Sequence, residues 1–313
     1  MNVAALSLRD LEYVVALAEE GHFGRAAERC NVSQPTLSVQ VRKLEGLLGL
    51  VLFERSQRRI LLTAGGEAVV RQARLVLAEA RRLLTVAREG SGTALSGRLE
   101  LAAIQTLGPY LFPRVLRRLR QDFPDVALAL SEGRTAEILD GLRDGRIDAA
   151  LLSLPLPESG LTVAPLFREP FLLACPADHD LATHPGPQAA DLAGPGLLLL
   201  DEGNCLRDQA VMACGAGPAT GRHATSLETL RSMVAAGAGY TLLPALAAPA
   251  GADPHGLTVT RGFGEDGPSR VIALVWRASD PRSGGLDRLA AFFRAHAPGA
   301  TLPCDVAATP VPP

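Results

Sequence analysis

The chain has 313 residues, a formal net charge of −2 and 47% hydrophobic residues, which suits two or three domains with apolar cores. This charge excludes a uniformly basic nucleic-acid binder, although residues 1–93 carry a net +3 and the remainder a net −5. The sequence contains no apolar run of 18 residues and no signal-like N-terminus, so we expect a cytoplasmic protein without membrane contact.

Five cysteines in a reducing compartment do not form a structural disulfide framework. Their spacings also match no zinc-binding pattern, so we expect neither a metal nor a cofactor. A cysteine pair that matters here is therefore expected to be redox-active. The five positions are Cys30, Cys175, Cys205, Cys214 and Cys304.

The first part of the chain predicts three short helices. Ser7 is a typical N-cap of the first helix, and Gly21 is a typical end. A second helix is expected over Phe23–Arg29. Ser33 caps a third, with Pro35 in its first turn, where a missing N–H costs nothing.

Strand-like pieces follow between Leu50 and Leu62, around an arginine-rich stretch that contains Arg58 and Arg59. Three helices and such a hairpin are the layout of a winged helix-turn-helix, in which the third helix enters the major groove. The alternative is a small three-helix packing unit without a role on DNA.

The motif residues favour DNA binding. The stretches Asn31–Ser38, Leu44–Gly49 and Leu52–Arg55 together resemble the signature of LysR-type transcriptional regulators. The resemblance implies a double-stranded DNA partner, a wing contact from Arg55, and contacts from the third helix. The implied helix residues are Ser33, Gln34, Pro35, Ser38 and Arg42.

A long helix is expected from Thr63 to about Glu89. Its apolar residues alternate spacings of four and three, which is typical of a coiled-coil seam. They are Val69, Ala73, Val76, Ala80, Leu83 and Ala87. One alternative is an amphipathic helix that packs on its own domain. The resemblance favours a dimerising linker helix, and therefore a homo-oligomer, expected as a dimer of dimers (a homotetramer).

The remaining residues alternate strand and helix patterns, which predicts a mainly parallel α/β sheet. A second unit is expected over 171–259, before the chain returns to the first unit through 271–276 and a final helix. The resemblance implies two lobes like those of a periplasmic binding protein. The predicted domains are a DNA-binding domain at 1–62, a linker helix at 63–92 and a regulatory domain at 93–313, so the fold class is α/β with an all-α N-terminal part.

Cys205 and Cys214 bracket one predicted helix that follows the apolar run Leu197–Leu200. Nine residues of helix rise about 13.5 Å, whereas a disulfide needs Cα atoms within roughly 7 Å. A disulfide would therefore require the helix to unravel, which would make it a switch. The alternative is a pair of buried apolar cysteines.

The segment Gly203–Ala210 is similar to the peroxide-sensing members of the LysR-type regulators, as are 106–111, 224–231 and 242–247. The resemblance implies that Cys205 is the peroxidatic thiolate and Cys214 the resolving thiol. It also implies a peroxide pocket, whose expected residues are Thr106, Thr135, Asn204, Arg207, Asp208 and Arg270. These members commonly have histidine where this chain has Asn204, and asparagine cannot carry charge.

Each pocket residue also has a simpler interpretation. Thr106 and Thr135 are plausible helix N-caps, and Arg207 and Asp208 are plausible members of a solvated helix face. We assign no chemistry to the histidines.

The resemblance thus implies a transcription activator of oxidative-stress genes that senses hydrogen peroxide by a reversible Cys205–Cys214 disulfide. Implied partners are RNA polymerase and the cellular thiol reductants that would reset the switch. Two alternatives are a regulator that binds a small inducer between the lobes and a thiol peroxidase. A winged helix is superfluous in an enzyme, so we expect no enzymatic function.

Overall fold

The structure is a computed structural model, and it describes residues 5–55, 60–89, 95–156, 160–215, 223–248 and 255–304. The main division between two compact units falls between Gly90 and Ser91. The predicted flexible break at 90–93 lies outside the described residues, as do Arg58 and Arg59 of the wing. The two units are described separately below.

The first unit contains the three predicted helices and the hairpin. Its elements are α1 (Leu8–Glu20), α2 (Phe23–Arg29), α3 (Gln34–Leu48), β1 (Phe53–Arg55), β2 (Ile60–Leu62) and α4 (Ala64–Glu89). The predicted caps are confirmed. The Ser7 hydroxyl accepts from the Asp10 backbone N–H, and Gly21 ends α1 with a φ of 59°. Ser33 accepts from the Thr36 N–H at the start of α3.

The wing is the hairpin of β1 and β2, and side chains at its base hold it in place. β1 and β2 pair antiparallel. Glu45 on α3 accepts hydrogen bonds from the N–H groups of Leu52 at 2.9 Å and Phe53 at 3.3 Å. The Thr63 hydroxyl donates to the Val51 carbonyl at 2.8 Å and accepts from the Gly66 N–H at 2.9 Å. The wing therefore starts and ends at fixed points, and α4 begins where it ends.

The first half of α4 packs on its own domain through Val70, Ala73 and Leu77, all buried in the helical core. Two positions of the predicted seam, Val76 and Leu83, are 38% and 70% exposed in the single chain. The interpretation of a helix that packs on its own domain is therefore confirmed for the first half of α4. The exposed positions leave the dimer seam as a prediction.

The second unit alternates strands and helices. Its elements are β3 (Gly97–Ile104), α5 (Gly108–Asp122), β4 (Val126–Gly133), α6 (Thr135–Arg143), β5 (Ala149–Ser153), β6 (Leu161–Pro176), α7 (Asp180–Thr183), a 3₁₀ turn (Ala189–Leu192), β7 (Leu199–Leu200), α8 (Cys205–Cys214), β8 (His223–Ala224), α9 (Leu227–Ala235), β9 (Thr241–Pro244), β10 (Thr258–Gly262), β11 (Ser269–Arg277), α10 (Ser283–Ala295) and β12 (Leu302–Pro303).

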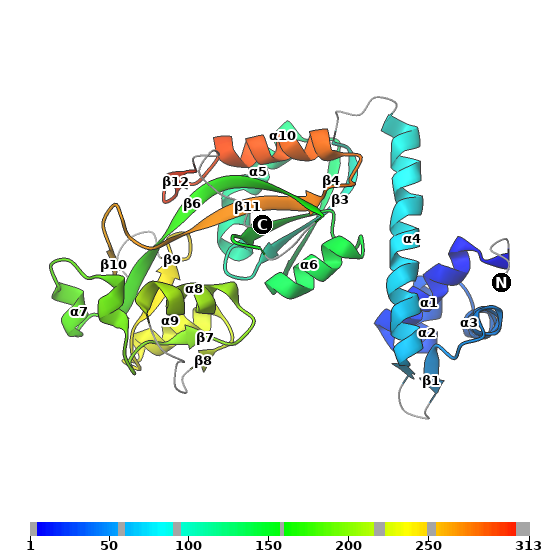
Figure 1. Cartoon of the computed structure of the whole chain (residues 1–313), viewed down its shortest axis with the longest axis horizontal. Coiled ribbons are helices and arrows are strands. Elements are labelled where there is room, and N and C mark those ends of the chain that lie inside the picture. The colour runs from blue at the N-terminus through cyan, green and yellow to red at the C-terminus, as the bar shows by residue number, and fades with distance from the viewer. Residues whose placement is uncertain are drawn as a thin grey trace. The chain divides into compact units, whose positions relative to one another are not determined.

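The prediction of a mainly parallel sheet is wrong, because the sheet is mixed. Its strand order is β10-β6-β11-β5-β3-β4, with β9 and β12 also pairing with β6. β3 is parallel to β4 and β5, but β11 is antiparallel to β5 and β6. The physical reason is that β6 carries the chain into the second lobe and β11 brings it back, so the two connecting strands run in opposite directions (Figure 1).

β6 is a single 16-residue strand that spans both lobes. The sequence instead predicts the second unit from Phe171, in the middle of this strand. Pro165 and Pro170 hide its continuity, since proline within a run argues against a strand interior. Ile272 pairs with Phe167 and Ala273 with Pro165, so Leu166 is the extra residue of a bulge directly after Pro165.

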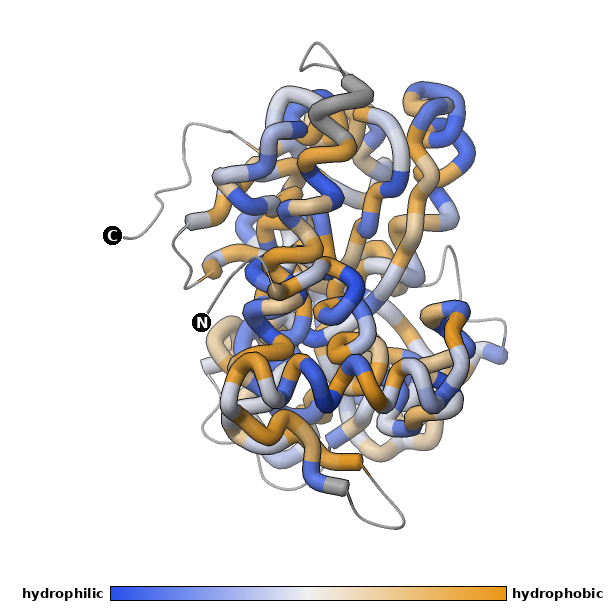
Figure 2. Tube along the Cα trace, turned by 90° about the vertical axis from the view of Figure 1, so that its right-hand side faces the viewer, coloured by the Kyte–Doolittle hydropathy of each residue, from blue (hydrophilic) through white to orange (hydrophobic). Residues whose placement is uncertain are grey.

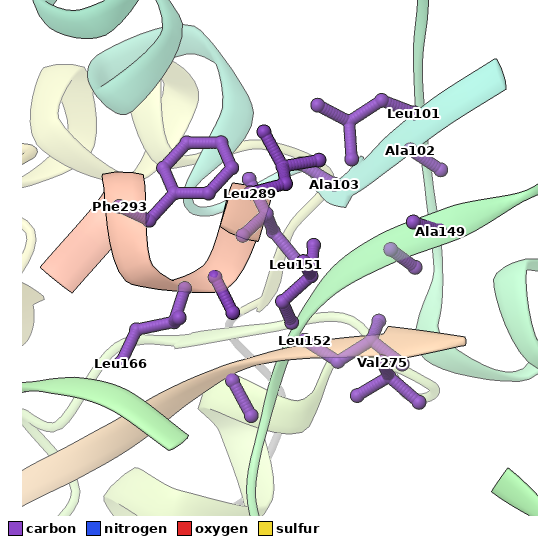
Figure 3. Close-up of a cluster of buried hydrophobic side chains, with 14 of the residues drawn as sticks. Leu101, Ala102, Ala103, Ala149, Leu151, Leu152, Leu166, Val275, Leu289 and Phe293 are labelled. Atoms are coloured by element: carbon purple, nitrogen blue, oxygen red, sulfur yellow. The ribbon is translucent and has the colours of Figure 1, made fainter. Parts of the chain in front are cut away.

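Each lobe has its own apolar core. In the first lobe, Leu289 and Phe293 of α10 lie one helical turn apart and point toward Ala103 of β3 and Leu151 of β5 (Figure 3). Along the helices, hydrophobic and hydrophilic residues alternate (Figure 2), as expected for elements with one buried face. No helix in the described ranges is long and apolar enough to cross a bilayer.

The junction between wing and linker yields a stability prediction. A Cβ on Gly66 would lie 2.1 Å from the Leu52 carbonyl oxygen, which is backbone and cannot move away cheaply. We expect Gly66→Ala to destabilise the first unit by about 1–3 kcal/mol. Urea unfolding followed by circular dichroism should show a lower midpoint. The fluorescence transition of Trp276, the only tryptophan and a second-unit residue, should stay unchanged.

The matched control is Gly46→Ala in α3, where an added Cβ meets no atom within 4 Å. Alanine is the better helix former, so this variant should gain about 0.5–1 kcal/mol. Equal midpoints for the two variants would contradict the close approach at Gly66.

Candidate functional site

The helix α8 begins at Cys205 and ends at Cys214, as the sequence predicts. The apolar run before it is buried, and a turn leads from β7 to the helix through Gly203, whose φ is +84°. Both cysteines are free. A spacing of nine positions separates the two Cα atoms by about 13.5 Å along the helix axis, so the sulfurs cannot bond while α8 is folded.

The two thiols have different surroundings. Cys214 is 1% exposed within the core of the second lobe, and burial raises the pKa of its thiol to about 11. Cys205 is only half-buried and packs against the core of the first lobe. Cys205 is therefore reachable from solvent at the lobe boundary, whereas Cys214 is held protonated and covered.

Asn204 occupies the N-cap position of α8 but makes no side-chain cap hydrogen bond. Its amide instead donates to the Asp201 carbonyl at 3.2 Å. The first backbone N–H groups of α8 therefore receive no acceptor from the Asn204 side chain. The Arg207 N–H is bonded to the Asn204 backbone carbonyl at 2.9 Å, but the side chain caps none of them, and a helix N-terminus favours negative charge near Cys205.

Two buried polar atoms near this region have no hydrogen-bond partner among the described residues, the Thr135 hydroxyl and the Gln209 carbonyl oxygen. Gln209 lies four residues after Cys205, hence on the same face of α8. Its amide donates to the Ser153 hydroxyl at 2.7 Å, at the end of β5. Sequence reasoning missed Gln209 and Ser153, although the four-residue spacing from Cys205 was a usable signal for Gln209.

Thr106 and Arg270 are joined directly. The Arg270 guanidinium donates to the Thr106 hydroxyl at 2.8 Å and to the Thr106 carbonyl at 2.9 Å. It also forms a fully buried ion pair with Glu169 at 2.8 Å. Because the Thr106 oxygen already accepts from Arg270, its O–H hydrogen remains available to donate to a ligand. The positive charge of Arg270, by contrast, is balanced by Glu169.

Neither threonine is a helix N-cap, so that alternative is wrong. Leu107 holds the N-cap position of α5 without a side-chain bond, and Thr135 is already the first residue of α6. The Thr106 hydroxyl faces Arg270 instead, and the Thr135 hydroxyl is buried without a partner in the described chain. Polar atoms in this state favour a ligand-binding interpretation.

Arg207 and Asp208 differ from the other predicted pocket residues. Arg207 donates to the Leu200 carbonyl at 3.0 Å and lies 3.0 Å from the His223 Nδ1. It therefore faces β7 and β8 within the second lobe. Asp208 is exposed on α8.

The DNA-facing candidates lie on α3. Gln34, Pro35 and Arg42 are exposed, and the Arg42 guanidinium donates to the Ser38 hydroxyl at 3.2 Å. Ser33 is exposed but its hydroxyl caps the helix. Arg55 is the last residue of β1, and its side chain lies outside the described part of the structure.

A second face of α3 borders a groove beside the N-terminus of α1. The cations Arg9 and Lys43 both line it. The remaining lining residues are Ala5, Ser7, Asp10, Tyr13, Val32, Thr36 and Gln40. Sequence reasoning did not single out this groove.

Comparison with known proteins gives matches over nearly the whole chain. Residues 8–67 match the model of the bacterial regulatory helix-turn-helix protein, lysR family, and residues 92–298 match the LysR substrate binding domain. The chain is 46% identical over 297 residues to the DNA-binding transcriptional dual regulator OxyR of Escherichia coli K12, covering 94% of this chain and 97% of the relative.

Two solved structures are also similar. Full-length OxyR from Pseudomonas aeruginosa, in a cysteine-to-aspartate variant, has a TM-score of 0.77 and 41% identity, covering 95% of this chain and 96% of that one. A cysteine-to-serine variant of Corynebacterium glutamicum OxyR with H2O2 bound has a TM-score of 0.64 and 34% identity, covering 93% and 92%.

The contrast between the thiols predicts selective alkylation. With its pKa raised to about 11, Cys214 is ionised at pH 7 in only about one molecule in 10,000. N-ethylmaleimide at pH 7 should therefore modify Cys205 well before Cys214 in the reduced, folded protein. Urea should abolish the difference. Peptide mass spectrometry measures both sites.

Cys175 is a built-in control, because it is also buried and burial also raises the pKa of its thiol. It should be protected like Cys214. Modification of Cys214 at the rate of Cys205, with Cys175 still protected, would contradict the buried environment of Cys214.

Proposed function

The chain belongs to the LysR family of bacterial helix-turn-helix regulators, and we propose that it activates transcription in response to hydrogen peroxide. The observation that carries the proposal is the placement of two free thiols at opposite ends of one helix, one accessible and one buried. Oxidation that joins them must refold this helix. Formation of one S–S bond would thereby cause a conformational change.

The first step takes place at Cys205. Its thiolate attacks one oxygen of the peroxide, so that an S–O bond forms, the O–O bond breaks and the sulfur becomes a sulfenic acid. The leaving hydroxide takes up a proton and becomes water. Donors aimed at the leaving oxygen lower the barrier. The available Thr106 O–H and the buried hydroxyl of Thr135 are suited to this role.

The second step uses Cys214. Its thiol attacks the sulfenic sulfur, an S–S bond forms, and the oxygen leaves as water. Before this can occur, α8 must open and Cys214 must leave the core of the second lobe, because the folded helix holds the sulfurs apart. Disulfide formation then holds the open state until a thiol reductant resets it.

The sensor would act on DNA through the first unit. Two chains joined along α4 present two α3 helices, which read two half-sites of double-stranded DNA. The exposed Val76 and Leu83 supply apolar surface for such pairing. A change at α8 that alters contacts between regulatory domains would change the spacing of the α3 helices and, through it, access of RNA polymerase to the promoter.

The reaction consumes the thiol in each event, so the chain acts as a stoichiometric sensor and not as an enzyme. A cytoplasmic location suits it, because thiol reductants there restore both cysteines. A dimer of dimers is the assembly we expect. The alternative of a small inducer keeps one specific support, since Thr135 and Gln209 have buried atoms without partners in the described chain.

Disulfide formation is the direct test. After brief exposure to a low peroxide concentration, non-reducing peptide mapping should find Cys205 joined to Cys214. Cys205→Ser should abolish the bond, and Cys214→Ser should leave Cys205 as a sulfenic acid that a dimedone probe traps. If Cys205 stays reduced or pairs with another cysteine, the inducer hypothesis takes precedence.

DNA binding gives a second test. Arg42→Ala should weaken binding to all sequences alike and lower the slope of log K against log salt by about 0.9, the expectation for one phosphate contact. Gln34→Ala should instead change the preference among operators, by about 1–3 kcal/mol at one position. Fluorescence anisotropy on operator and scrambled duplexes separates the two. Unchanged binding in both variants would contradict the role of α3.

A further inference from the structure

A thiolate at Cys205 is stabilised by positive charge nearby, yet the predicted cations are already engaged. Arg270 is paired with the buried carboxylate of Glu169. Arg207 keeps its charge, but its guanidinium is held on the side of β7 and β8, bound to the Leu200 carbonyl and lying against His223. Asn204 carries no charge at any pH. The predicted pocket residues therefore leave this charge unassigned.

Arg134 belongs to the first lobe and lies beside the turn that leads into α8. It connects β4 to α6 and directly precedes Thr135. At Gly203, two residues before Cys205, a built Cβ would lie 3.5 Å from the Arg134 Nη1 and 3.6 Å from its Cδ. The guanidinium of Arg134 thus rests on the turn that leads into α8. Within the described chain, no hydrogen bond or ion pair engages this guanidinium.

The Cys205 face of α8 is turned toward the same lobe. Cys205 packs against the core of the first lobe, and Gln209, one turn further, bonds to Ser153 of that lobe. Arg134 therefore stands on the side to which the Cys205 side chain is directed. Glycine at 203 is favoured by the φ of +84° at this turn, and the Arg134 side chain lies in van der Waals range of it.

The other charged groups around this turn are mostly acidic. Asp201 and Glu202 precede α8, and Asp208 lies in its first turn. On the opposing helix, the Glu137 carboxylate accepts from the Arg134 backbone N–H at 3.0 Å. Without Arg134 the local balance would be negative, which disfavours a thiolate.

We propose that Arg134 is a positioning residue that supplies positive charge to the Cys205 thiolate from the opposite lobe, where a histidine at position 204 would otherwise supply it. This inference rests on the proposed peroxide function. The thiol proton leaves to water, and the guanidinium stabilises the anion that remains. The same charge then faces the hydroxide that leaves when the O–O bond breaks.

The test uses the full-length reduced protein and iodoacetamide. Alkylation at Cys205 is followed by mass spectrometry from pH 5 to pH 10 for wild type, Arg134→Gln and Arg134→Lys. For the glutamine variant we expect a rate at pH 7 about two- to fivefold lower, with equal rates at high pH, because a partly exposed charge acts at moderate strength. The midpoint of its pH profile should lie higher than that of wild type.

Three readouts separate charge from shape. Arg134→Lys should retain most of the wild-type rate. The difference between wild type and Arg134→Gln should shrink in 1 M salt, where the Debye length is about 3 Å. Asn204→His should raise the rate at pH 7 more in the Arg134→Gln background than in wild type. Arg117→Gln, which removes an exposed guanidinium from α5 of the same lobe, is the matched control and should behave as wild type.

Overlapping profiles for wild type and Arg134→Gln would overturn the inference, and so would a lysine variant as slow as the glutamine variant. Alkylation does not require peroxide, so these outcomes are independent of disulfide mapping. A normal Cys205–Cys214 bond with overlapping profiles rejects only the role of Arg134. If the pH profiles of wild type and Arg134→Gln differ but no Cys205–Cys214 disulfide forms, only the peroxide function is rejected.

Discussion

The rise of an α-helix is the constraint on which the regulatory unit depends. While α8 is folded, the spacing of nine positions holds the Cα atoms of the two cysteines about 13.5 Å apart along the axis, roughly twice the largest Cα separation that a disulfide tolerates. Reduced and oxidised chains therefore cannot share one backbone conformation in this segment. The burial of Cys214 stabilises the reduced, helical state. The turn at Gly203, with its positive φ, leads into the helix at the end where opening would begin.

The sequence predicted those helix ends that are determined by residues close together in the chain. Ser7, Gly21 and Ser33 mark helix ends because capping involves residues only three or four apart. The start of α8 at Cys205 follows from the buried run and turn before it. The three helices and the hairpin indicated the winged helix, and the family resemblance added the two lobes; the family models and the OxyR structures confirm both.

Contacts between distant residues could not be predicted in the same way. The continuity of β6 depends on pairing with β11, about a hundred residues later, and Pro165 and Pro170 conceal it. The pairing of Arg270 with Glu169 has no local signature, so the sequence suggested a free cation where the structure has a neutralised one. Arg134 was overlooked because its relation to Gly203 exists only in the folded regulatory unit.

The Arg270–Glu169 pair also limits how a signal can travel. The two residues face each other in register on β11 and β6, the strands that join the lobes. Both side chains are fully buried, and separating such a pair costs about 3–5 kcal/mol, since it leaves an uncompensated charge. The ion pair between β6 and β11 therefore resists any hinge motion of the two lobes that would pull these strands apart. In the proposed switch, a change at α8 would therefore act through the surface of the second lobe, while the two lobes keep their positions relative to each other.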